Sequence, residues 1–311
     1  MSGITTMPVL LSCALALWLY VAIAGEFKDD VLSAACSSCN FLTRFSALLC
    51  YVAVALMLNS LHLFERRIAW LMSLFLWLVA VSMYINYDLH AAFSVMALMA
   101  SVTMLFSCQL AVEHERALYT VFALLGGTSL MTPVVLLLLP IFVAFTFFSN
   151  IITVKRGFAM LLGLLTPYWL LFGIGYVYEP ALAFFSGIKD FFVHDGFSIA
   201  LPPFYVLLSM LVELLVFVPS SVFFFTSSFP GKPLLRKRLL FVFLFNLSLL
   251  LLTFFVSGQS ELLYAFRIPG CAVMMSYLFV QRITKLSNIY FIFVNLIWIS
   301  LALYCLWMEL F

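Results

Sequence analysis

The chain has 311 residues, of which 66% are hydrophobic and 9% are charged, and its formal net charge at pH 7 is +2. Soluble globular domains are typically about 45–50% apolar and about 25% charged, so this chain has too few polar side chains to cover a water-facing surface. The composition excludes a soluble globular protein and indicates a polytopic membrane protein.

Long apolar runs separated by charged breaks predict the membrane spans. A helix needs about 20 apolar residues to cross about 30 Å of hydrocarbon, and runs without period-two alternation favour helices over the strands of a β-barrel. We therefore expect an all-α transmembrane bundle in which residues 1–311 form a single integral membrane domain of about eleven spans. The expected spans are 7–25, 44–64, 67–86, 90–112, 116–132, 133–150, 157–178, 201–226, 239–257, 267–281 and 287–308.

The basic residues predict the orientation, because cytoplasmic loops collect Lys and Arg. With the N-terminus inside, eleven of the 15 basic residues fall in inner loops, including the runs "VKR" and "LLRKR", and four fall outside. We therefore expect a cytoplasmic N-terminus and a periplasmic C-terminus. The first span lacks a basic leading region and a small-x-small exit, so it is expected to stay as an anchor.

The first outer loop, "AGEFKDDVLSAACSSCN", holds the carboxylates of Glu26, Asp29 and Asp30. A carboxylate at the membrane surface can act as a general base toward a hydroxyl or bind a metal ion. The alternative is an ordinary solvated loop. Cys36 and Cys39 of the same loop either form a disulfide in an oxidising compartment or pack as small side chains. One Cys-x-x-Cys pair without a second pair is a weak signal for zinc.

Two further outer segments are candidate parts of a functional site. The loop "NYDLH" offers Asp88 and His90, which either converge with the first loop or form a polar turn at the interface. Residues 179–200 place five apolar side chains at helical spacing, so we expect an amphipathic helix that lies in the interface plane on the outer face. Such a helix is either a lid beside a site or a plain connector between two spans.

Glu213 lies near the middle of an apolar run, "PPFYVLLSMLVELLVFVPSS". A carboxylate at this depth costs about 2.5–3.5 kcal/mol on insertion scales, so it should face the bundle interior and have a partner. Asn246, His62 and Asn295 are the candidate partners. The carboxyl group either relays protons or makes one structural hydrogen bond.

The segment "SGQSELLYAFRIPG" places Glu261 and Arg267 on the outer face, at the start of the short span 267–281. Arg is a natural bidentate clamp for phosphate, and a lipid-phosphate headgroup in the outer leaflet would be within its reach. Lys189 and Arg44 are further outer basic residues that could assist. The alternative is an interfacial Arg that extends its charge to the membrane surface.

The stretch "ERALYTVFALLGGTSLMTPVVLLLLPIFVAFTF…VKRGFAMLLGLLTPYWLLF" contains "SLMTP", at which 116–150 is either two short spans or one broken helix. The stretch resembles a hairpin of the C-type (GT-C) membrane glycosyltransferases. It also resembles a multi-pass inner-membrane family of Bacteroidota that brings no established activity with it. The matching positions are Gly126, Gly127, Thr132, Pro133, Lys155, Arg156, Gly163, Pro167 and Tyr168.

The GT-C resemblance implies transfer of a sugar from a polyprenyl-phosphate carrier at the outer face of the bacterial inner membrane. It implies a catalytic base in the first outer loop, here Asp29 or Asp30, and donor-phosphate binding by a late outer basic residue, here Arg267. The chain departs from that pattern in three ways. Its first outer loop is short, "KDD" stands where an Asp-Glu pair is usual, and we expect no C-terminal soluble domain.

The expected function is therefore a small GT-C-like glycosyltransferase. In that function Asp88 and His90 would assist the base, and Lys189 would assist Arg267. Two alternatives remain: a non-catalytic envelope-assembly or membrane-complex subunit, and a lipid or small-solute transporter that uses Glu213. The expected partners are membrane lipid, a polyprenyl-phosphate-linked sugar and a membrane protein, with no nucleic acid. No cofactor or metal site is predicted, and a divalent cation at the loop acids is left open.

Overall fold

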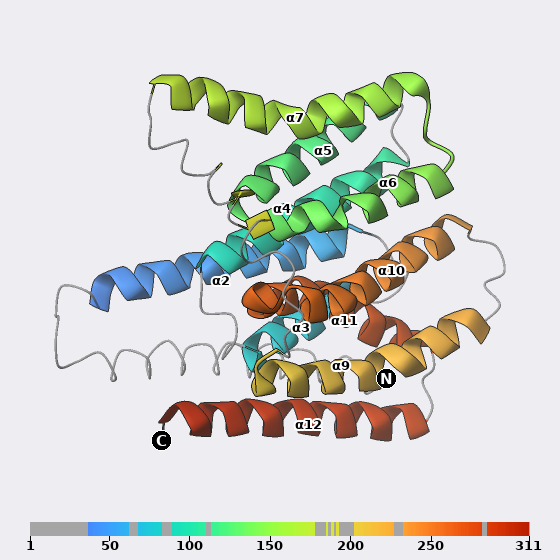
Figure 1. The fold of residues 1–311 in the computed structure, drawn as a ribbon. Coiled ribbons are helices and arrows are strands. Elements are labelled where there is room, and N and C mark those ends of the chain that lie inside the picture. The colour runs from blue at the N-terminus through green and yellow to red at the C-terminus, as the bar shows by residue number, and fades with distance from the viewer. Residues whose placement is uncertain are drawn as a thin grey trace. The chain divides into compact units, whose positions relative to one another are not determined.

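A computed structural model of the chain describes residues 37–61, 68–82, 89–109, 113–177, 185, 188–189, 191–192, 202–226, 233–281 and 285–310. Within these ranges the regular elements are helices (Figure 1). In chain order they are α2 (Ser37–Ser60), α3 (Ile68–Val81), α4 (Leu89–Cys108), α5 (His114–Met131), η1 (Pro133–Leu138), α6 (Leu139–Phe148), α7 (Val154–Val177), α9 (Phe204–Thr226), α10 (Pro233–Phe255), η4 (Ser257–Gln259), α11 (Ser260–Gln281) and α12 (Lys285–Leu310).

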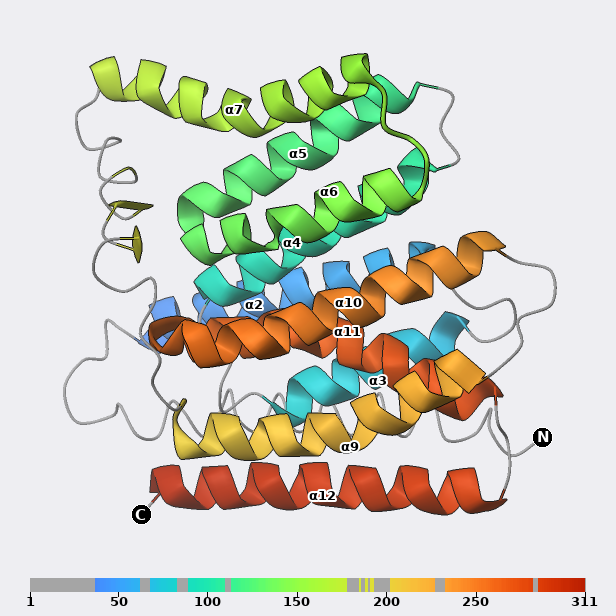
Figure 2. The same ribbon diagram turned by 45° about the vertical axis from the view of Figure 1, so that its right-hand side comes forward.

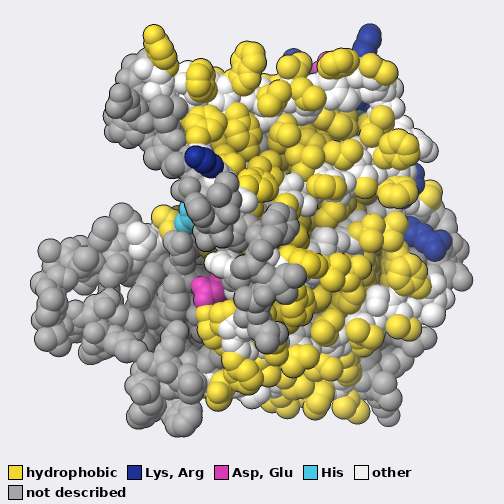
Figure 3. Space-filling model, in the orientation of Figure 1, with side chains coloured by type: hydrophobic (Ala, Val, Ile, Leu, Met, Phe, Trp, Pro, Cys, Tyr) yellow, Lys and Arg dark blue, Asp and Glu magenta, His cyan; other side chains and the backbone are white. Residues whose placement is uncertain are grey.

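The expected all-α class is confirmed for the described residues, and five of their helices are long and apolar enough to cross a membrane. Hydrophobic side chains make up much of the described surface drawn in Figure 3, as lipid contact requires. Every expected span from 44–64 onward overlaps a helix, whereas 7–25 lies outside the described residues. The five helices are Leu89–Cys108, Val154–Tyr176, Phe204–Thr226, Pro233–Phe255 and Ser260–Phe279.

The chain divides into two compact units. Unit one comprises 1–93, 203–228 and 264–311, and its described part holds α2, α3, α9, α12 and most of α11. Unit two comprises 94–202 and 229–263, and holds α5, η1, α6, α7, α10 and most of α4.

In unit one, α12 is fastened to two other helices by side-chain hydrogen bonds. Trp77 of α3 donates its indole N–H to the Asn295 side chain over 2.8 Å. The hydroxyl of Tyr290 donates to the carbonyl oxygen of Leu215 in α9. That carbonyl has no partner within its own helix, because the residue four positions later is Pro219, which lacks an N–H. The α12 tyrosine therefore satisfies a backbone group that the proline leaves open.

In unit two, α5 and α7 pack so closely that two glycines are required. A Cβ atom on Gly126 would lie 2.5 Å from the carbonyl oxygen of Leu164, and one on Gly163 would collide with the carbonyl of Tyr119. Small residues let two helix backbones approach in this way. Tyr168 of α7 also hydrogen-bonds the hydroxyl of Ser129 in α5 over 2.6 Å. Several residues that carry the GT-C resemblance therefore form a helix–helix contact.

The chain turns back at Thr132, so 116–150 forms two helical segments. Thr132 ends α5 with an extended backbone, φ −133° and ψ 90°, and Pro133 begins η1. A residue that precedes proline is disfavoured in the helical conformation, which explains the break. Figures 1 and 2 both show the chain reversing its direction between α5 and α6.

Candidate functional site

A buried charge pair joins two membrane-length helices of unit one. Glu213 lies near the middle of α9 and is 5% exposed, and Arg267 lies in α11 and is 1% exposed. The Nε atom of Arg267 is 3.4 Å from Oε2 of Glu213. Glu213 therefore faces the interior and has a charged partner, as a carboxylate at membrane depth requires.

The helix periodicity explains why Glu213 is buried. One face of α9 points into the protein and recurs at intervals of three and four residues, as expected for an amphipathic helix. The opposite face carries exposed aliphatic side chains at Leu211, Leu215, Val218 and Val222. The buried face consists of Val206, Ser209, Met210, Val212, Glu213, Val216, Ser220 and Phe224.

Arg267 is held within α11, a helix that is buried almost all round. Residues three positions before and four positions after it, Tyr264 and Cys271, share its face of the helix. The guanidinium carbon lies 5.3 Å from the centroid of the Tyr264 ring, in cation–π geometry. Cys271 is also buried. The guanidinium group is thus buried and faces the Tyr264 ring and the carboxylate of Glu213.

The pair leaves hydrogen-bonding capacity unused. Nε, Nη1 and Nη2 of Arg267 and Oε1 of Glu213 make no hydrogen bond to any described residue. The 3.4 Å ion-pair distance also exceeds the 2.7–2.9 Å that is typical of a charge-assisted hydrogen bond. Desolvating two charges is costly unless further hydrogen bonds satisfy them. Burying this pair is therefore costly. A third hydrogen-bonding group would stabilise it more than it would stabilise a salt bridge whose hydrogen bonds are already made.

One expectation about these residues is wrong, and the charged partner of Glu213 was not among the candidates. Arg267 was expected at the outer surface as the first residue of a span, but α11 begins seven residues earlier, at Ser260, and buries it. Glu213 pairs with Arg267, which was not among the partners that the sequence suggested. Of those residues, Asn295 bonds Trp77 through its Oδ1 atom, and His62 lies outside the described residues.

The other predicted site residues do not join this pair within the described residues. His90 is exposed in the first turn of α4, and Lys189 and Glu261 are exposed as well. Arg44 lies in α2, but its side chain is not described. Glu26, Asp29, Asp30, Asp88 and Cys36 lie outside the described residues, as does most of the expected surface helix 179–200.

Comparisons with protein-family models, with curated proteins and with solved structures found no match. Among the described residues, no cluster of three or more His, Cys, Asp or Glu side chains could hold a metal ion. The loop acids that could bind a divalent cation lie outside the described residues.

A second polar cluster, which the sequence did not predict, lies in unit two. Arg238 is buried, and donates from Nε to Oε1 of Gln109 over 3.1 Å and from Nη2 to the carbonyl oxygen of Phe106 over 2.9 Å. Gln109 in turn donates to the hydroxyl of Ser149 over 3.0 Å. The cluster satisfies a carbonyl in the last turn of α4, where helix carbonyls lack partners. Since each polar group has a partner, we interpret the cluster as structural.

Proposed function

We propose that this chain is an inner-membrane protein of about eleven spans that binds the phosphate of a lipid-linked substrate at Arg267. In this proposal it is a GT-C-like glycosyltransferase, which moves a sugar from a polyprenyl-phosphate carrier to an acceptor at the outer face. One observation carries the proposal: Arg267 is buried in a helix that is long and apolar enough to cross a membrane, and its Nη1 and Nη2 donors bond no described residue. An ionisable residue inside a spanning helix is a functional candidate by default.

The geometry suggests how phosphate would bind. A guanidinium group offers two parallel N–H donors to a phosphate, which matches the two unused Nη atoms of Arg267. Glu213 would oppose the incoming negative charge, because its carboxylate already neutralises the arginine at 3.4 Å. We expect the phosphate to replace Glu213 as the counter-ion, with the Glu213 carboxyl group taking up a proton or moving away.

Access to the buried pair requires α9 and α11 to separate locally. Both helices contain an internal proline, Pro219 in α9 and Pro269 in α11. Prolines remove a backbone hydrogen bond and are the commonest places at which helices kink. Pro219 lies six residues after Glu213, and Pro269 lies two residues after Arg267, so each helix has a weak point near the pair.

The catalytic base in this proposal is Asp29 or Asp30, assisted by Asp88 and His90. Lys189, Arg44 and Glu261 are the proposed contacts of the carrier headgroup. These roles follow from the GT-C resemblance and the predicted outer face.

The second polar cluster supports the prediction that three loops of unit two lie on one and the same side of the membrane. The bonds from Gln109 to Ser149 and Arg238 join the end of α4, the end of α6 and the start of α10. These three helix ends adjoin three loops that the charge bias assigns to the cytoplasmic side. Their convergence at one end is what that assignment requires.

Sugar transfer from a synthetic polyprenyl-phosphate sugar by the purified protein tests the proposal. The double variant D29N/D30N is expected to lose transfer and keep binding of the lipid phosphate, because the base is not a phosphate ligand. Arg267→Met is expected to lose both, and Arg116→Met, which removes an exposed arginine, is the matched control. Undiminished transfer by D29N/D30N would overturn the enzymatic role.

A second function is favoured by Oε1 of Glu213, an acceptor that bonds no described residue and belongs to a buried carboxyl group in a helix long and apolar enough to cross a membrane. Such a group can accept a proton during transport, as carboxylates in proton-coupled transporters do. In that case Glu213→Gln abolishes proton-coupled flux into proteoliposomes, and D29N/D30N leaves it unchanged. The sugar-transfer and proton-flux experiments therefore distinguish the enzyme from the transporter.

A further inference from the structure

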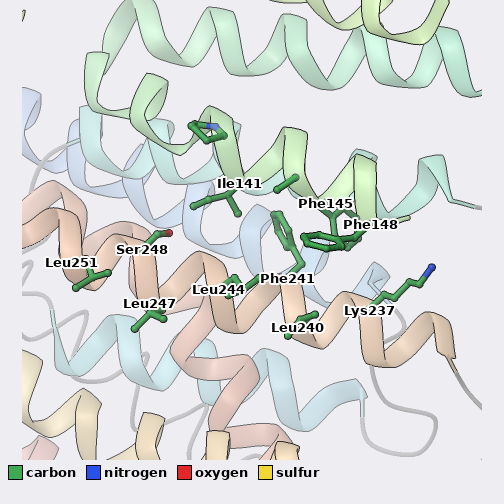
Figure 4. A pocket seen from close by; sticks show the side chains of 12 residues that line it. Ile141, Phe145, Phe148, Lys237, Leu240, Phe241, Leu244, Leu247, Ser248 and Leu251 are labelled. Atoms are coloured by element: carbon green, nitrogen blue, oxygen red, sulfur yellow. The ribbon is translucent and has the colours of Figure 1, made fainter. Parts of the chain in front are cut away.

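An apolar groove runs between α6 and α10 of unit two and has a volume of about 390 Å³ (Figure 4). Ile141, Phe145 and Phe148 line it from α6, and an apolar row that includes Phe241 lines it from α10. Figure 4 shows Lys237 at the Phe148 end, while Leu251 lies toward the other end. The groove therefore has one cationic end and a long hydrocarbon wall.

The charge at that end is uncompensated. Lys237 makes no hydrogen bond or ion pair with any described residue, and neither α6 nor α10 contains an acidic residue. Arg236 is an exposed neighbour that adds a second positive charge. Arg238 is buried and directs Nε and Nη2 to Gln109 and Phe106, so Lys237 and not Arg238 is the cation that lines the groove. The mouth of the groove thus favours an anion.

The dimensions fit one lipid chain. Lys237 and Leu251 are separated by fourteen residues of helix, which correspond to about 21 Å at about 1.5 Å per residue. One leaflet of a bilayer contributes about 15 Å of hydrocarbon, so the groove can follow a chain through a whole leaflet. A docked helix about 10 Å wide would occupy roughly 1,600 Å³ over this length, which is far more than the groove holds.

We propose that the α6–α10 groove binds one acyl chain of an anionic glycerophospholipid, with the headgroup phosphate at Lys237. The charge bias assigns the start of α10 to the cytoplasmic side, so this lipid belongs to the inner leaflet. It is therefore separate from the outer-face substrate of the proposed enzyme. Arg238 of α10 bonds Gln109 at the end of α4, and Gln109 bonds Ser149 at the end of α6, so in this proposal the bound lipid lies beside a contact that links three helices of unit two.

Native mass spectrometry of the full-length protein with added lipids tests this proposal. The wild type is expected to retain phosphatidylglycerol about tenfold more strongly than phosphatidylcholine, a difference of about 1.4 kcal/mol. Lys237→Ala should remove that preference. Lys155→Ala, which removes an exposed lysine at the start of α7 in the same unit, should leave it unchanged.

A second variant tests the hydrocarbon wall separately from the charge. Leu244 lines the groove and is exposed within it, so Leu244→Trp fills the groove without burying a new group in the core. This variant should lose retention of phosphatidylglycerol and keep its fold. Equal losses in Lys237→Ala and Lys155→Ala would overturn the proposal, because they indicate attraction to any surface charge. Retention by Leu244→Trp, or displacement of phosphatidylglycerol by a polyprenyl phosphate at equal concentration, would also contradict it.

Discussion

Helices α7 and α11 are both long and apolar enough to span a membrane, yet the protein uses them in opposite ways. In the apolar window of α11 89% of the residues are buried, whereas in that of α7 only 11% are. The α7 helix contacts its neighbour through glycines and turns aromatic and aliphatic side chains outward, including Trp169 and Phe172. The α11 helix instead carries a buried arginine. Hydropathy therefore identifies both as membrane helices but does not show which one forms the core.

This difference predicts the largest mutational effect at Arg267. Arg267→Met leaves the Glu213 carboxylate buried without its counter-ion, and such losses typically cost about 3–5 kcal/mol. We therefore expect the free energy of unfolding, measured in detergent, to fall by this amount. The double variant E213L/R267M should recover most of the lost stability, because it removes both charges together. A double variant as unstable as the single one would show that the pair is not the source of the effect.

A smaller effect is expected where α7 meets α5. Gly163→Val forces a side chain against the α5 backbone, and overpacking of this kind costs about 1–3 kcal/mol. Gly173 is the matched control, since it lies in the same helix and a Cβ atom there would have no neighbour within 4 Å. Gly173→Ala should be neutral or stabilising by up to about 1 kcal/mol. Thermal unfolding of both variants measures the difference, and equal destabilisation would contradict close packing at Gly163.

The smallest of these effects is expected at Tyr290. Tyr290→Phe removes the hydroxyl that donates to the Leu215 carbonyl, and the loss of one such bond costs about 1 kcal/mol. Pro219→Ala should reduce the penalty, because alanine supplies an N–H that the Leu215 carbonyl can accept within α9. A double-mutant cycle on thermal stability measures this coupling. Additive effects would mean that the tyrosine does not substitute for the missing helix bond.

The sequence predicted the class of fold and the burial of Glu213, because apolar runs and an acid at membrane depth have simple physical consequences. It did not predict the partner. Arg267 was treated as the boundary of a short span, although the apolar residues on both sides of it already formed one continuous helix from Ser260. The close packing of Gly163 against α5 was also missed, since small residues in membrane helices do not indicate which helix they contact. Such pairings depend on tertiary packing.

Binding of a polyprenyl phosphate to the purified protein tests the central claim, that Arg267 is an anion-binding group and Glu213 its displaceable counter-ion. The dissociation constant should be measured for the wild type, Glu213→Gln and E213L/R267M. The account predicts tighter binding by Glu213→Gln, because the competing carboxylate is gone, and loss of binding by E213L/R267M. Equal affinities in all three proteins would contradict it and leave the pair as a structural link between α9 and α11.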